Sequence, residues 1–206
     1  MSNKNEIEAI FIIVFIILAS LILLVLCIKG CKRNRSFLLT GKRRAGIWGE
    51  HIAVDIIKSV LYESDIMLNN VAFEYGDNEV EIDSLVINSR GVYVIEVKNY
   101  SGDLYGKADD FELFQEKETS AGNVYSKWVK NPVPQVKRQV HNLAKFLQYY
   151  GIDVWVEGYV YFINNNCPFK SKHLLRNKYD IDRAIHPRQP RQLSNKEIKQ
   201  IVKILE

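Results

Sequence analysis

The stretch of sequence that decides the fold is EVEIDSLVINSRGVYVIEVK, residues 79–98. Its first half alternates between polar and apolar residues, and its second half is rich in β-branched and aromatic residues, both of which are typical of β-strands. Between the halves lies Asn88-Ser89-Arg90-Gly91, which fits a tight turn with Ser89 and Arg90 as a two-residue loop. The stretch therefore predicts an antiparallel hairpin within a central sheet.

A two-residue loop also fixes the register of this hairpin. The pairs that it predicts, in order from the turn, are Ile87–Val92, Leu85–Val94, Asp83–Glu96 and Glu81–Lys98. Because side chains alternate between the two faces of a strand, the four charged residues of these pairs are expected on one face.

Two carboxylates that face each other across a strand pair repel each other and cost stability. A divalent cation would offset the repulsion between Asp83 and Glu96, since Mg²⁺ in proteins is bound by one or two carboxylates, water and substrate phosphate oxygens. Lys98 would lie one pleat beyond Glu96, where it could orient or activate a water or neutralise charge on a scissile phosphate. The alternative is a solvated strand face with an ordinary surface ion pair between Glu81 and Lys98.

Outside the hairpin, the hydrophobic pattern changes repeatedly between helical and strand periods. Helices are expected at 45–64, 132–150 and 194–206, the last one opened by a capping box. Strands are expected at 66–74, 79–88, 91–98 and 154–163, with two or three short strands within 102–128. Residues 170–192 have no clear period. This order predicts an α/β (α+β) domain in which helices flank a mixed central sheet.

Residues 9–28 form an apolar run in which Ser20 is the only polar residue. A helix of about 20 residues spans roughly 30 Å, the thickness of the hydrocarbon core of a bilayer. We therefore expect one transmembrane helix at 9–28, preceded by a short extracytoplasmic tail at 1–8. The competing interpretation is a secretory signal peptide, which would need a positively charged flank and a shorter apolar run, whereas this flank is net acidic.

A basic block follows the apolar run, because residues 29–44 contain seven Lys or Arg and no acidic residue. Positive flanks stay in the cytoplasm, so the block predicts a single-pass protein of the cell membrane with its N-terminus outside and its C-terminal domain in the cytoplasm. Residues 29–41 form a juxtamembrane connector. Four of its residues are expected to contact the anionic inner leaflet: Lys29, Lys32, Arg33 and Arg35. Cys27 and Cys31 lie at this boundary, where acylation and ordinary packing are both open.

The net charge of +4 is unevenly distributed. Residues 45–165 have ten basic and eighteen acidic residues, whereas residues 166–206 have ten and four. A phosphate backbone is attracted to the second region and is repelled by the first without a metal. We therefore expect nucleic-acid contacts from this basic C-terminal extension, with a solvated tail as the alternative. The candidates are Lys170, Lys172, Arg176, Lys178, Arg183, Arg188 and Arg191.

Four separated blocks of the chain occur in the same order as in a known family. The blocks are GIWGE at 46–50, EIDSLVI at 81–87, GVYVIEVKN at 91–99 followed by Gly102, and Asn131-Pro132 with Gln135. In these blocks the chain resembles the nuclease-related domain (NERD), a branch of the PD-(D/E)XK nuclease superfamily. The resemblance covers about residues 42–162 and places the domain at 42–165.

The resemblance implies a restriction-endonuclease-like core with a metal-dependent site. Asp83 and Glu96 match the metal-binding carboxylates, the backbone carbonyl of Val97 matches a further ligand, and Lys98 matches the catalytic lysine. Ile82 replaces the proline that precedes the aspartate in the superfamily, as it does in the NERD branch.

Two further positions match residues that surround such a site. Glu50 on the first helix matches the additional acidic residue that completes the metal site, and Gln135 on the second helix matches the polar residue close to it. Together with the apolar run, the resemblance implies a membrane-anchored nuclease that uses Mg²⁺ or Mn²⁺ to hydrolyse phosphodiester bonds of DNA or RNA. The alternative is a nuclease-fold module that binds nucleic acid or a protein partner at the membrane without cleaving.

Overall fold

The computed structural model describes residues 40–188 and 192–206, with side chains from Trp48 onward. The chain divides into two units, Met1–Arg44 and Ala45–Glu206, and the second unit is described below. The tail, the spanning helix and residues 29–39 of the connector, all predicted from the sequence, lie outside the described residues. No helix of the described residues is long and apolar enough to cross a membrane.

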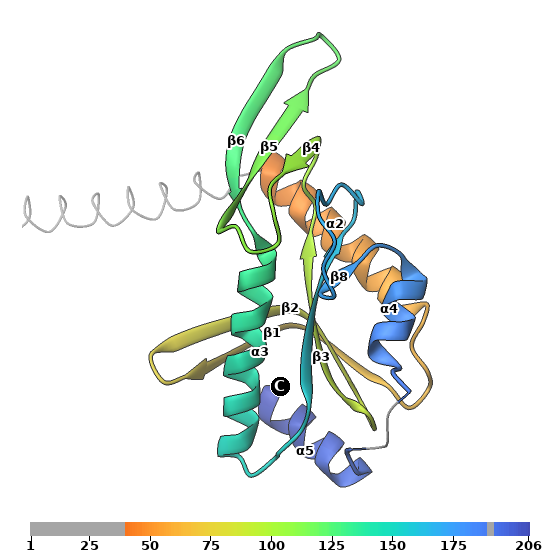
Figure 1. The fold of residues 1–206 in the computed structure, drawn as a ribbon. Coiled ribbons are helices and arrows are strands. Elements are labelled where there is room, and N and C mark those ends of the chain that lie inside the picture. The colour runs from red at the N-terminus through yellow and green to blue at the C-terminus, as the bar shows by residue number, and fades with distance from the viewer. Residues whose placement is uncertain (1–39, 189–191) are drawn as a thin grey trace, which may run out of the picture. The chain divides into compact units, whose positions relative to one another are not determined.

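A mixed five-stranded sheet forms the centre of this unit (Figure 1), in the order β1-β2-β3-β7-β8. Its first three strands are antiparallel, and β7 and β8 run parallel to β3. The strands are β1 (Ile66–Tyr75), β2 (Asn78–Asn88), β3 (Gly91–Lys98), β7 (Val156–Phe162) and β8 (Leu174–Leu175). This arrangement confirms the predicted mixed central sheet.

A second, antiparallel sheet is inserted between β3 and the helix that leads back to β7. It consists of β4 (Asp103–Tyr105), β5 (Glu112–Glu118) and β6 (Val124–Lys130), in this order. The helices of the unit are α2 (Thr40–Lys58), α3 (Pro132–Tyr149), α4 (Lys178–Ile185) and α5 (Asn195–Leu205). The inserted sheet confirms the prediction of short strands within 102–128.

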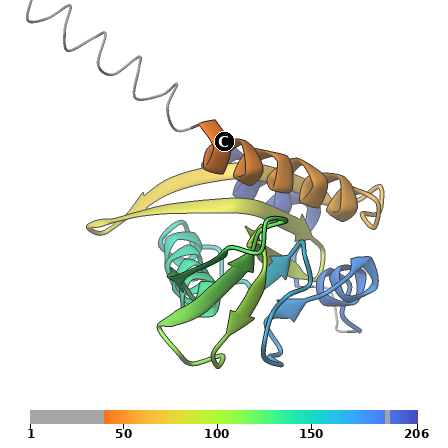
Figure 2. The ribbon, with the colours of Figure 1, turned by 90° about the horizontal axis from the view of Figure 1, so that it is seen from above.

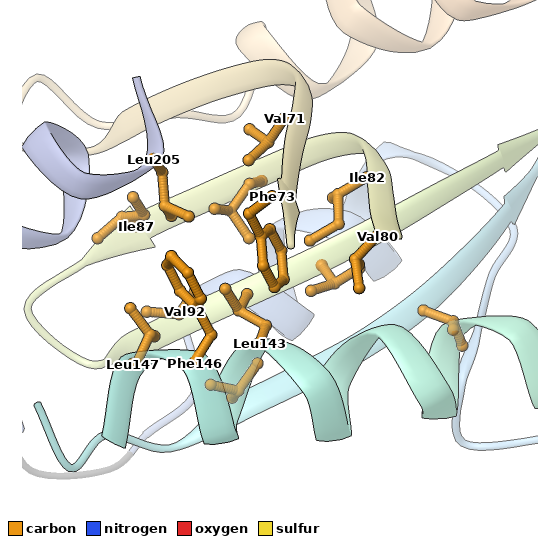
Figure 3. Close-up of a cluster of buried hydrophobic side chains, with 14 of the residues drawn as sticks. Val71, Phe73, Val80, Ile82, Ile87, Val92, Leu143, Phe146, Leu147 and Leu205 are labelled. Atoms are coloured by element: carbon orange, nitrogen blue, oxygen red, sulfur yellow. The ribbon is translucent and has the colours of Figure 1, made fainter. Parts of the chain in front are cut away.

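The central sheet has a hydrophobic core on each face. Apolar residues of α3 and α5 pack on one face against side chains such as Phe73, Ile87 and Val92 (Figure 3). On the other face, residues of α2 and α4 pack against Tyr93 and Ile95. Figure 2 shows α2 and α3 on opposite sides of the β1–β2 hairpin. The near-continuous burial of β3 follows from this covering, since a central strand has no solvated face.

Both predicted ends of the first helix were wrong. The first helix ends at Lys58 rather than at residue 64, because the Ser59 hydroxyl bonds to the carbonyl of Ile56 and a turn closed by Asp65 follows. The same helix begins at Thr40 and so includes the last two residues of the predicted connector. Within 170–192, where no period was visible, α4 is capped by Asn177.

Candidate active site

The predicted hairpin register is confirmed over its first five pairs, from Asn88–Gly91 to Ser84–Ile95. Beyond Ser84 no further pair joins the two strands, and Figure 1 shows the β1–β2 hairpin diverging from the end of β3. Asp83 is the first residue of β2 beyond this ladder. The candidate site therefore lies where two central strands separate, a place where side chains from both strands become accessible.

Asp83 also lies at an irregularity of the β1–β2 pair. The register is constant on both sides, yet Asn70 and Asp83 do not pair, and Asn70 has a left-handed backbone with φ of 53°. Ile82 and Leu85 pack in the same core although they are an odd number of residues apart, so the regular alternation of β2 is interrupted between them. The predicted single charged face, with Glu81 and Asp83 beside Glu96 and Lys98, is therefore wrong.

The carboxylate of Asp83 is held by the backbone of the neighbouring strand. The N–H of Val97 donates a hydrogen bond of 2.8 Å to its Oδ2. Asp83 also lines a cavity of about 400 Å³ together with Glu50 and His51 of α2, so it opens toward the α2 side of the sheet.

The carboxylate of Glu96 lies toward the opposite helix, α3. It is 2% exposed and accepts hydrogen bonds of 2.7 Å from Gln135 at Oε1 and from Gln139 at Oε2. The ammonium group of Lys98 forms an ion pair with Oε1. Both oxygens of this buried carboxylate are thus hydrogen-bonded, as a buried charge requires.

The carboxylate cluster consists of Asp83, Glu96 and Lys98, whose charges interact with one another. Burial, reinforced by repulsion from Glu96, raises the pKa of Asp83 from 3.8 to about 6. Burial by itself would lower the pKa of Lys98, but the attraction and hydrogen bond to Glu96, together with the attraction to Asp83, outweigh it, so the pKa of Lys98 is raised. The cluster therefore contains a lysine that keeps its proton and a carboxyl group that ionises reluctantly unless a cation stabilises it.

The first helix brings Glu50 to the site because it approaches the sheet closely at Gly49. A Cβ atom at this position would lie 2.8 Å from atoms of Asn99 and of Ile163. The next residue, Glu50, contributes to the repulsion that raises the pKa of Asp83. The glycine thus sets the distance between the helix and the end of β3.

The structure places the five predicted site side chains in two adjoining groups: Lys98 and Gln135 contact Glu96 on the α3 side, and Glu50 lines a cavity with Asp83 on the α2 side. Asp83 links the groups, because it interacts electrostatically with both Glu96 and Glu50. Sequence reasoning missed Gln139, which also bonds to Glu96. Its signal was its spacing, since a residue four positions after Gln135 lies on the same helix face.

The basic residues of the C-terminal extension are placed elsewhere. Lys172 lines a cavity beside β7 and Lys178 lines a cavity beside Tyr62, and neither cavity contains a residue of the carboxylate cluster. Lys170, Arg176, Arg183 and Arg188 are exposed. Arg191 lies outside the described residues. Backbone contacts from this segment remain a prediction.

The donor set suits a hard cation with few protein ligands. Within the described part of the chain, no three His, Cys, Asp or Glu side chains form a ready-made metal cage. Mg²⁺ does not need one, because it keeps several waters and binds one or two carboxylates. Asp83 and Glu96, whose mutual repulsion a cation would relieve, fit this requirement.

A family model described as the nuclease-related domain (NERD) matches residues 45–163 of the chain. The matched range runs from α2 to the end of β7 and includes all the site residues above. Comparisons with curated proteins and with solved structures gave no match.

Proposed function

The chain belongs to the nuclease-related domain family, and from this premise we propose that it is a membrane-anchored, metal-dependent nuclease that hydrolyses phosphodiester bonds of DNA or RNA. The observation that carries the proposal is the repulsion between two carboxylates, Asp83 and Glu96, together with the partly buried Lys98, which is ion-paired with Glu96. The repulsion between the two carboxylates costs stability unless a bound ligand offsets it, and such groups are typical of functional sites.

In this proposal, Mg²⁺ or Mn²⁺ is held by Asp83, Glu96 and the backbone carbonyl of Val97, with Glu50 completing the site. The bound ion would polarise the scissile phosphate and offset its negative charge. Support for this donor set comes from the Val97 peptide, whose N–H is fixed by Asp83 directly beside Glu96.

Lys98 acts as a cation in the proposed reaction. Its raised pKa means that it is protonated at neutral pH, so it donates hydrogen bonds and does not serve as a base. A fixed ammonium group in a partly buried site stabilises negative charge that develops on a phosphate more strongly than an exposed one does. Gln135 and Gln139 position Glu96, because they determine where its two oxygens lie.

A second candidate is a nuclease-fold module that binds nucleic acid or a protein partner without cleaving. One observation favours it: three donors already satisfy the Glu96 carboxylate, so the cluster does not require a metal to be complete. In this case Lys98 has the structural role of a counter-ion.

A cleavage assay tests the proposed function and separates these two candidates. Full-length protein in detergent micelles is incubated with end-labelled single- and double-stranded DNA and RNA, with Mg²⁺, Mn²⁺ or EDTA. We expect cleavage that needs the metal and falls at least 100-fold in Asp83→Asn and Lys98→Met, about the size of a lost charge-stabilising contact. Matched controls are Asp103→Asn and Lys117→Met, both exposed on the second sheet. Absence of cleavage by the wild type, or equal loss in the controls, would leave only the binding module.

The membrane part of the proposal places residues 9–28 across the bilayer, with the domain at its cytoplasmic face. It rests on the apolar run and on the basic block that follows. Protease added outside intact cells should leave the domain uncut, and deletion of 9–28 should release it from the membrane fraction. Digestion of the domain in intact cells would reverse the orientation.

A further inference from the structure

A cavity of about 720 Å³ lies between the tip of the β1–β2 hairpin and α3. Its volume falls in the range of small-molecule and cofactor sites, about 300 to 1,000 Å³. Polar side chains from three elements contribute to its wall: Asn78, Glu79, Glu81, Lys130, Arg138 and Asn142.

The cavity adjoins the candidate active site through two side chains. Gln135 and Gln139 line it, and the same two residues donate hydrogen bonds to Glu96. A ligand in the cavity is therefore separated from the carboxylate cluster by a single layer of glutamine side chains. A molecule in the cavity therefore lies next to Glu96 and Lys98, where the proposed function places the scissile phosphate.

One buried amide in this wall has an unused hydrogen-bonding group. The Oε1 atom of Gln139 is buried without a partner in the described residues. Asn142, which is 9% exposed, lines the same cavity. Buried amides are usually satisfied, so this oxygen of Gln139 beside the cavity calls for a partner, a water or a ligand, that the described residues do not supply.

The composition of the wall identifies the chemistry of this ligand. Two cations, Lys130 and Arg138, balance two carboxylates, Glu79 and Glu81, so the cavity does not select a bare phosphate. The wall contains both donors and acceptors, which suits the edge of a nucleobase, where carbonyl, amino and ring-nitrogen groups occur together. Phe111, which is 76% exposed and lines the same cavity, offers a flat apolar face for stacking.

We propose that this cavity binds an unpaired nucleobase of a single-stranded nucleic acid whose backbone continues to the Glu96–Lys98 cluster. Cleavage of the phosphodiester in this proposal rests on the proposed function, whereas binding of the base does not. A base within a duplex is paired and stacked, so its edge and its faces cannot enter a cavity of this kind. The substrate class is therefore unpaired DNA or RNA rather than an intact duplex.

Binding without catalysis tests the proposal. The anisotropy of a labelled 12-nucleotide single strand of mixed sequence, and of the same strand in a blunt duplex, is measured with full-length protein in detergent micelles and EDTA. We expect the single strand to bind at least tenfold more tightly than the duplex. Arg138→Met and Asn142→Leu should each weaken single-strand binding about 5- to 100-fold, the discrimination that a good base contact provides.

The controls lie on the same helix but outside the cavity: Lys145→Met and Gln148→Leu, whose side chains are exposed and bond to each other. Arg138 is exposed, so Arg138→Met keeps the test valid if Asn142→Leu does not fold. Equal affinity for strand and duplex, or unchanged affinity in Arg138→Met, would overturn the proposal. Binding of adenosine monophosphate without binding of the oligonucleotide would overturn it in favour of a free nucleotide.

The outcomes separate this proposal from the proposed function. If the single strand binds with the expected dependence on Arg138 but is not cut with Mg²⁺, only the nuclease proposal fails. If cleavage occurs with equal rates on strand and duplex and is unaffected by Arg138→Met, only the base cavity fails.

Discussion

Gln139 of α3 donates a hydrogen bond of 2.7 Å to Oε2 of the buried Glu96. The same amide nitrogen lies 2.8 Å from the backbone carbonyl of Glu81. Since Glu96 belongs to β3 and Glu81 to the diverging part of β2, one side chain of α3 bridges the two strands where their own ladder has ended. The separation of the strands is thus stabilised from the helix.

Replacement of this glutamine should therefore weaken the whole unit. Gln139→Leu removes one of three donors from a buried carboxylate, and a hydrogen bond to a charged group contributes about 1.5 to 3 kcal/mol. We expect a fall of about 2 kcal/mol in the free energy of unfolding, measured by urea denaturation followed by circular dichroism. The control Gln148→Leu changes an exposed residue of the same helix and should stay within about 0.5 kcal/mol. Equal effects would show that the bridge contributes nothing.

The bridge also marks the limit of what the sequence could predict. The turn at Ser89-Arg90 fixed the hairpin pairs, because a two-residue loop allows one register, and these pairs are present from Asn88–Gly91 to Ser84–Ile95. The prediction of a charged face beyond these pairs was wrong, because it assumed that the alternation of side chains and the strand pairing continue past Ser84. The break depends on the left-handed Asn70 in another strand and on contacts with α3, and neither is visible in the local pattern of β2.

The metal-free protein should lose stability as pH rises through the titration of Asp83. Its pKa is about 6 in the folded state against 3.8 for the ordinary carboxyl group. Between these values the folded state binds more protons than the unfolded state, so the free energy of unfolding falls with rising pH. At 1.36 kcal/mol per pKa unit the full loss is at most about 3 kcal/mol. Urea denaturation in EDTA at pH 4.5 and pH 7.5 measures the part of this loss that falls between these two pH values, about 2 kcal/mol.

The variant Asp83→Asn isolates this contribution, because asparagine does not ionise. In EDTA at pH 7.5 it should be more stable than the wild type, and the difference should shrink toward pH 4.5. Added Mg²⁺ should stabilise the wild type and leave the variant unchanged, since ligand binding to the folded state adds to its stability. A wild type that becomes more stable relative to Asp83→Asn as pH rises would contradict the prediction.

The close approach of α2 at Gly49 should be needed for the site as well as for packing. In Gly49→Ala the new methyl group would lie 2.8 Å from Asn99 and Ile163, so the helix must move outward and carry Glu50 with it. Overpacking of this kind costs about 1 to 3 kcal/mol. We expect a loss of this size in urea denaturation and a weaker Mg²⁺ response in the cleavage assay. Asp55→Ala, at an exposed position of the same helix, should change neither.

His186 should stabilise the far end of the unit, where it joins α4 to the turn before β1. Its Nε2 lies 2.8 Å from Asp65, whose side chain is 2% exposed, and its Nδ1 lies 2.7 Å from Asp182, which is 45% exposed. The imidazole also stacks on Tyr62 with ring centroids 3.9 Å apart. His186→Ala leaves the buried Asp65 without this partner, and breaking a buried pair costs about 3 to 5 kcal/mol.

The two carboxylates provide an internal comparison for this prediction. Asp182→Ala removes only the exposed partner, and such pairs contribute about 0 to 1 kcal/mol. Urea denaturation at pH 6 should therefore show a loss for His186→Ala several times larger than for Asp182→Ala. If both variants lose the same small amount, the backbone N–H of Tyr62, which donates to the same oxygen of Asp65 at 2.7 Å, is enough to hold that carboxylate. A much larger loss of stability in His186→Ala than in Asp182→Ala would instead show that the buried Asp65–His186 pair attaches α4.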